Sequence, residues 1–95
     1  FELEKHFLKH NEDFNYMFKN SKEYLDAAND VIKNGTKVSY LYNNKVTYGY
    51  VQFYANSTRN GMAKFAFVGM NNSRIATFHV KNAKELWRLL GRIGI

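Results

Sequence analysis

The residues that could do acid and base chemistry begin near the start of the chain, in the segment Lys5-His6-Phe7-Leu8-Lys9-His10. If this segment is helical, His6 and His10 project from one face, with Lys9 three residues after His6. Imidazoles titrate near neutrality, so two of them can share the acid and base roles of one reaction beside an ammonium group that holds an anion. The competing interpretation is a surface helix that carries His and Lys for no catalytic purpose.

A second pair of candidates lies in the last predicted strand. Alternation there sends Ala76, Phe78 and Val80 to one face and Thr77 and His79 to the other. The apolar set suits a core under helices, so the hydroxyl and the imidazole should point to the open side of the sheet. The alternative is that both are ordinary residues of an exposed strand face.

Two helices are expected to position the first group of residues. Apolar residues at helical spacing predict helices over residues 2–10 and 21–34. Asn20 or Ser21 should cap the second helix, because Glu23 stands where a capping box needs an acid.

After Gly35 the apolar period changes from that of a helix to that of a strand. Short turns between successive strands imply an antiparallel meander. The strands are expected at 37–42, 46–54, 63–70 and 74–80, with a closing helix at 82–90. The chain should be one α+β domain over residues 1–95, with two N-terminal helices packed on a four-stranded, twisted antiparallel sheet and a short C-terminal helix.

The net charge of +6 is unevenly distributed. Seven of the eight acids fall among the first thirty residues, whose net charge is −3, whereas Glu85 is the one acid from Val31 onward and the net charge there is +9. The second part of the chain should therefore attract polyanions. A membrane surface is the weaker choice, because no predicted helix pairs a basic stripe with a wide apolar one. Cysteine is absent, which excludes disulfides and thiolate chemistry.

Tyrosine is concentrated in the predicted hairpin, with more phenols than one small core needs. Aromatic rings under a basic rim can stack unpaired bases, although a cross-strand tyrosine ladder would also stabilise a sheet that binds nothing. The residues predicted to contact RNA are Tyr40, Tyr48, Tyr50, Lys45, Arg59, Lys64 and Lys81.

RNA carries its own nucleophile, the 2′-hydroxyl, so its cleavage needs only a base, an acid for the 5′-oxygen and cations for the phosphorane. A metal route is less favoured. His6 and His10 could hold zinc on one helix face, but no His-Glu-x-x-His signature surrounds them and no acidic cluster lies in the basic part of the chain. No metal site and no cofactor are therefore predicted.

Several segments resemble C-terminal toxin domains of bacterial polymorphic and contact-dependent inhibition systems. The opening His6-Phe7-Leu8-Lys9-His10 is similar to a His-Phe-x-Lys-His helix of those domains, and Asp13-Phe14 to the acid-Phe step that follows it. Ser21-Lys22-Glu23-Tyr24-Leu25 is similar to their Ser-x-Glu-Tyr-Leu helix, and Arg74-Ile75-Ala76-Thr77-Phe78 to their last strand. The chain departs from the family pattern at His79, where an aromatic residue or Lys is more usual.

The resemblance implies the Barnase/EndoU/colicin/RelE fold group, in which N-terminal helices pack on a twisted sheet whose open face cleaves RNA, often tRNA, without metal. It also implies a cognate immunity protein, and the basic second part of the chain predicts that this partner is acidic. The domain would be the C-terminus of a larger secreted or cell-surface effector that acts in the cytoplasm of a target bacterium.

The sequence therefore predicts a metal-independent endoribonuclease that cuts tRNA in or near the anticodon loop. One helix histidine, His10 before His6, is expected to act with His79 as acid and base. Lys9 and Arg74 should stabilise the phosphorane, and Thr77 should orient a phosphate oxygen. The alternatives are a non-catalytic basic RNA-binding module and a docking module of a larger effector. Helix and sheet histidines more than about 10 Å apart would exclude the nuclease.

Overall fold

The computed structural model describes residues 2–91 and has the predicted α+β class, with helices before and after a four-stranded antiparallel sheet. Each predicted helix and strand lies within three residues of its expected bounds, because the helical period and the turn residues are local signals, whereas the short 3-10 helix was not predicted. The elements are α1 Leu3–His10, a 3-10 helix Asn11–Phe14, α2 Ser21–Asn34, β1 Thr36–Tyr42, β2 Lys45–Asn56, β3 Ala63–Asn71, β4 Arg74–Asn82 and α3 Ala83–Gly91.

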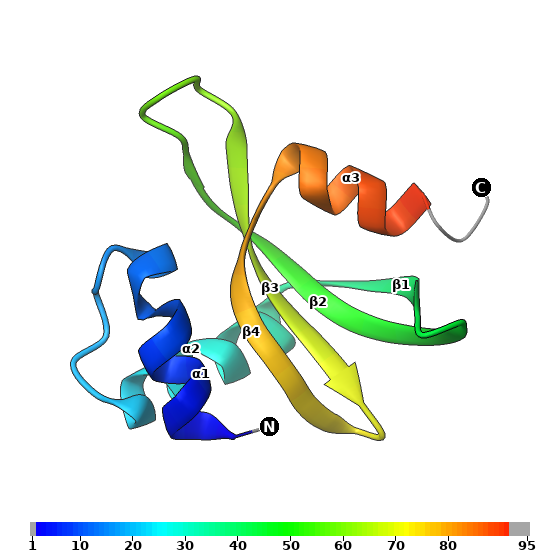
Figure 1. Ribbon diagram of the computed structural model, residues 1–95, viewed down its shortest axis with the longest axis horizontal. Helices are drawn as coiled ribbons and strands as arrows, with labels where there is room; N and C mark the ends of the chain where they lie inside the picture. Colours follow the sequence, from blue (N-terminus) through cyan, green and yellow to red (C-terminus); the bar gives the residue numbers. More distant parts are fainter. Residues whose placement is uncertain (1, 92–95) are drawn as a thin grey trace.

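The strands follow one another in the order β1-β2-β3-β4, and all neighbours are antiparallel (Figure 1). Two-residue turns join β1 to β2 at Asn43-Asn44 and β3 to β4 at Asn72-Ser73, with φ of 51° and 62° in the first and 50° and 64° in the second. Positive φ at both turn residues matches the twist of a hairpin. The two tight turns therefore lie at the same end of the sheet.

The main core lies between one face of the sheet and the N-terminal helices. The Tyr24 hydroxyl of α2 is fully buried there and donates a hydrogen bond to the backbone carbonyl of Phe78 on β4. Aromatic side chains dominate this core. Its buried members are Phe14, Phe18, Tyr24, Ala28, Val31, Ala66, Val68, Met70 and Phe78.

The opposite face of the sheet is partly covered by α3, which contacts β1, β3 and β4 (Figure 1). Leu86 of α3, Tyr40 of β1 and Phe67 of β3 are buried without belonging to the main core. The register places Thr77 and His79 on this face, because Gly69 pairs with Thr77 and Phe67 pairs with His79. We call it the α3 face.

Local hydrogen bonds fix the start of α2 and the end of α1, the helix that carries His6, Lys9 and His10. The Asn20 side chain accepts from the backbone N–H of Glu23 at 3.0 Å, so Asn20 and not Ser21 is the cap of α2. The Asn11 amide binds the backbone of Phe18 in both directions, at 3.2 and 3.4 Å. These bonds close the loop between α1 and α2 and hold the end of α1 near the core.

Candidate active site

The three histidines of the chain lie together where α1 runs along the edge strand β4. The rings of His10 and His79 stack with their centroids 5.1 Å apart, and the rings of His6 and His10 are 5.9 Å apart. This separation is well inside the limit of about 10 Å set for general acid and base catalysis at one phosphate. The fold therefore brings the N-terminal histidines to the predicted sheet histidine.

All three imidazoles have a hydrogen-bond partner at Nδ1, which for His6 is the backbone carbonyl oxygen of Glu2 at 3.1 Å. The Thr77 hydroxyl lies 2.9 Å from His79 Nδ1, and a carboxylate oxygen of Asp13 lies 3.2 Å from His10 Nδ1. In both rings Nε2 is then the nitrogen suited to proton transfer. The Thr77 hydroxyl, which was expected to orient a phosphate oxygen, instead contacts the His79 imidazole and can orient that ring.

Burial strongly perturbs the titration of His79. Removal from water, together with the smaller effects of the positive charges of Lys81 and His10, lowers the pKa of His79 to about 4, while Asp13 opposes the shift. Burial also lowers the pKa of His10, against the opposing hydrogen bond and charge of Asp13. His79 is therefore a neutral imidazole at pH 7.

A hollow of about 1030 Å³ opens on the α3 face, between the histidine cluster and the two hairpin turns. His6, Thr77, His79 and Lys81 border it at one end. The end near the turns is bordered by Tyr42, Asn43, Lys45, Asn71, Asn72 and Ser73. His10, which stacks on His79, is not part of this lining. Of the two helix histidines, His6 is thus the one that faces the open space.

Two glycines make room for aromatic rings under the hollow. A Cβ on Gly69 would lie 2.9 Å from the Tyr40 hydroxyl oxygen and 3.1 Å from the Thr77 methyl carbon. A Cβ on Gly49, which pairs with Gly69, would meet the Phe67 and Tyr40 rings at 3.2 and 3.3 Å. Tyr40 therefore reaches across β2 to the side of Thr77, close to the histidine cluster. Burial raises the pKa of its phenol, which stays protonated as a hydrogen-bond donor.

Other predicted catalytic residues are separated by the structure. Lys9 is exposed on α1, close enough for its charge to lower the pKa of His10. Arg74 stands at the opposite end of β4, where it borders a different hollow of about 670 Å³ with Ile75 and Ala76. Five residues of strand, about 16 Å, separate its backbone from that of His79. Arg74, which was expected to stabilise the phosphorane, therefore lies away from the histidine cluster.

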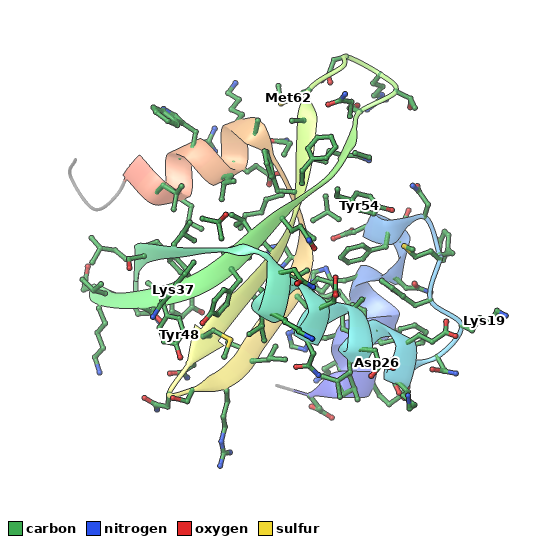
Figure 2. The ribbon with its side chains drawn as sticks, turned by 180° about the vertical axis from the view of Figure 1, so that it is seen from behind. Lys19, Asp26, Lys37, Tyr48, Tyr54 and Met62 are labelled. Atoms are coloured by element: carbon green, nitrogen blue, oxygen red, sulfur yellow. The ribbon has the colours of Figure 1, made fainter. Side chains whose placement is uncertain are left out.

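The predicted RNA-contacting tyrosines divide between the two faces. Tyr40 and Tyr48 both border the hollow, but Tyr48, like Tyr50, packs its partly buried ring against the main core. Figure 2 shows Tyr48 beside α2 and Lys37, whose Nζ lies 4.6 Å from the Tyr48 ring centroid. The reason is the hairpin register, which places Tyr48 opposite Ser39 and on the other side of the sheet from Tyr40.

The predicted basic contacts are also dispersed. Lys81 and Lys45 border the two ends of the hollow. Arg59 lies in the loop between β2 and β3, and Lys64 points toward the Tyr54 ring at 5.7 Å. Only Lys81 and Lys45 of these four lie where a ligand in the hollow would meet them.

The structure brings to the site three further residues to which the sequence patterns assign no role. Asp13 follows His10 by three residues, a spacing that places the two on neighbouring turns and that could have indicated their hydrogen bond. Phe67 lies beneath His79, with ring centroids 5.5 Å apart. Gly69 provides the space for Tyr40. The last two depend on strand register, which single residues do not reveal.

Within residues 2–91, no group of three or more His, Asp or Glu side chains has an arrangement that could hold a metal ion. None of the helices in this range has the length and apolar character needed to cross a membrane.

Comparison of the chain with models of protein families, with curated proteins and with solved structures finds no match. The resemblance to toxin domains therefore rests on the sequence motifs themselves. Function has to be argued from the chemistry of the site.

Proposed function

We propose that this protein is a metal-independent endoribonuclease. The observation that carries the proposal is the convergence of His6, His10 and His79 beside a hollow of the sheet that Lys81 also borders. Two imidazoles and an ammonium group at one hollow are a sufficient set for cleaving RNA through its own 2′-hydroxyl.

His79 is the general base in this proposal. Its pKa of about 4 keeps it neutral at pH 7, and the tautomer in which Nδ1–H donates to Thr77 leaves a lone pair on Nε2. Nε2 takes the proton of the 2′-hydroxyl as this oxygen attacks phosphorus. Thr77 acts as a positioning residue that fixes the tautomer and the ring.

His6 is the general acid, because it borders the hollow on the other side from the sheet. As the 2′-oxygen forms its bond to phosphorus, the bond to the 5′-oxygen breaks and protonated His6 gives this oxygen a proton. The products are a 2′,3′-cyclic phosphate and a 5′-hydroxyl. His10, paired with Asp13 and stacked on His79, holds the two reacting imidazoles in place.

The charge of the phosphorane is stabilised by donors that border the same hollow. Lys81 is two residues after His79 on the same strand face. The Tyr40 hydroxyl, which reaches over Gly69 to Thr77, can donate to a non-bridging oxygen. Lys9 on α1 adds positive potential from the helix side. Lys81 and Tyr40 thus take the role first expected of Arg74.

The proposed substrate is tRNA, cut in or near the anticodon loop, as the motif resemblance implies. The basic second part of the chain, with a net charge of +9, supports a polyanionic substrate and an acidic cognate immunity protein. The proposed setting is a secreted or cell-surface effector whose toxic domain acts in the cytoplasm of a competing bacterium.

The test is to incubate the protein with total tRNA in EDTA and to map the product ends. Discrete cleavage that leaves 2′,3′-cyclic phosphates and 5′-hydroxyls is expected. His79→Gln and His6→Gln should each abolish it, whereas Lys33→Gln, a change of an exposed cation on α2, should not. No cleavage, or cleavage lost on chelation, would refute the proposal.

One observation favours a non-catalytic RNA-binding module instead. His10 and His79 stack at 5.1 Å, which leaves no room for a phosphate between their faces. In that case the imidazoles are packing groups and the hollow only binds. Retention of tRNA without cleavage would identify this second function.

A further inference from the structure

We infer that the hairpin end of the hollow is a binding subsite for one unpaired nucleobase, which stacks on Tyr42. This inference rests on the proposed ribonuclease function and names the class of its substrate, RNA that is single-stranded next to the cut. The supporting observations are the exposure of the Tyr42 ring, its place on the α3 face and its neighbours across the hairpin.

Tyr42 is the tyrosine of the hollow that offers its ring to a ligand. Its side chain is 65% exposed, whereas Tyr40 is 5% exposed and is covered by the sheet and Phe67. Tyr48 also borders the hollow, but its partly buried ring packs against the main core on the opposite side of the sheet. A solvated ring in a hollow can receive a base on its face, and every base can stack there.

The spacing suits a nucleotide that adjoins the scissile phosphate. Tyr42 and Tyr40 are two residues apart on β1, so they share the α3 face at a backbone separation of about 7 Å. Tyr40 in turn reaches Thr77, which is bonded to His79. A base on Tyr42 is therefore close to the point where the ribose and phosphate would be cut.

The neighbours of Tyr42 can bind the phosphate and the base edge of that nucleotide. Lys45 pairs with Tyr42 across the turn and can hold the adjoining phosphate. The amides of Asn43 and Asn72, from the two hairpin turns, border the same end and can donate to and accept from a base edge. A base paired within a duplex has both faces covered by its stacked neighbours, so this subsite selects an unpaired one.

Binding can be measured without cleavage by using fluorescently labelled 2′-O-methyl RNA, which lacks the nucleophile. The wild-type protein should bind a stem-loop more tightly than a fully paired duplex of equal length. Tyr42→Ala should weaken stem-loop binding about 5- to 150-fold, the equivalent of one stack of ~1 to 3 kcal/mol, and should leave duplex binding unchanged. Tyr42→Phe, which keeps the ring, should bind as the wild type does.

Tyr16→Ala is the matched control, because Tyr16 is 68% exposed and is not among the residues that border the hollow. Its stem-loop affinity should equal that of the wild type. Equal affinity of Tyr42→Ala and wild type for the stem-loop, or equal affinity of the wild type for both RNAs, would overturn the base subsite while leaving cleavage untouched. Failure of the wild type to bind either RNA would instead count against the proposed function.

Discussion

At the scale of single residues, the site depends on groups whose chemistry is set by their surroundings. His79 is kept neutral by burial and by Lys81, and its Nδ1 is hydrogen-bonded to the Thr77 hydroxyl, which leaves Nε2 for a ligand. Tyr40 can reach the same place because Gly69 has no side chain; a Cβ at Gly69 would lie 2.9 Å from the Tyr40 hydroxyl oxygen. Each of these effects can be tested by one substitution.

Tyr40→Phe removes the hydroxyl and keeps the ring that packs on Phe67. A hydrogen bond to a charged group is worth ~1.5 to 3 kcal/mol, so the cleavage rate should fall about 10- to 150-fold. Rates on tRNA, with thermal melting as a check of folding, measure the effect. Tyr16→Phe is the matched control, because Tyr16 is exposed and does not border the hollow, and its rate should stay near that of the wild type. An unchanged rate in Tyr40→Phe would show that its hydroxyl does not touch the phosphate.

The titration of His79 can be followed by NMR without any substrate. Its pKa should lie near 4 in the wild type. Lys81→Gln removes a positive charge that disfavours the imidazolium, so the pKa of His79 should rise in that variant. Lys33→Gln, on the exposed side of α2, should leave it unchanged. A wild-type value near 6.5 would mean that water reaches the imidazole.

At the scale of elements, the interface between α1 and β4 decides whether a site exists. No residue of α1 is fully buried, so the helix is held by the partly buried Leu3 and Phe7 and by the stack of His10 on His79. An interface made partly of imidazoles depends on their being neutral. Acid should therefore loosen α1 before it melts the sheet.

This instability has a defined pH window. The folded-state pKa values of His10 and His79 are lowered. As the pH falls, the unfolded chain therefore binds more protons than the folded chain does. The free energy of unfolding should fall as pH drops from about 6.5 toward about 4, by roughly 2 to 3 kcal/mol for His79 alone. Asp13 partly offsets the effect, and Lys9, Lys81 and His6 add to it.

Urea unfolding of the wild type and of His79→Gln across this window measures the effect, because the titration of the carboxylates cancels in the difference. The wild type should lose stability relative to the variant as the pH falls. Hydrogen exchange should show the α1 amides losing protection first. A difference that stays constant with pH would mean that His79 has an ordinary pKa.

The elements were predictable from the sequence, but their docking was not. The capping group of Asn20 and the paired asparagines at 43 and 44 act over a few residues, so they fix α2 and the first hairpin locally. The docking of α1 on β4 joins residues far apart in the chain, and it decides that His6 faces the hollow while His10 stacks behind it. Sequence patterns carry no information on that choice.

The faces on which the tyrosines lie could have been predicted in part, by counting the strand register from the turn. The prediction that Tyr48 and Tyr50 share a face with Tyr40 treated each strand separately. A two-residue turn pairs Tyr42 with Lys45 and therefore Tyr40 with Thr47, which sends Tyr48 to the other side. The register could have been counted from the turn, and doing so would have left Tyr40 and Tyr42 as the tyrosines of the α3 face.

At the scale of the whole molecule, acidic and basic residues lie in different parts of the fold. The acidic first part of the chain forms the helices that cover one side of the sheet, and the basic remainder forms the sheet and α3. Lys45 and Lys81 border the hollow itself. An approaching polyanion is thus attracted to the side of the molecule that holds the histidines.

The salt dependence of RNA binding tests this arrangement. Each phosphate contact to a single strand contributes a slope of about −0.7 in the logarithm of affinity against that of salt concentration. Lys45→Gln and Lys81→Gln should each reduce the slope for a 2′-O-methyl stem-loop by about that amount. Lys22→Gln is the matched control, because Lys22 lies on α2 and is paired with Asp26 at 2.9 Å. If all three variants reduced the slope equally, binding would follow the net charge and not the hollow, and the site would lose its role in placing the RNA.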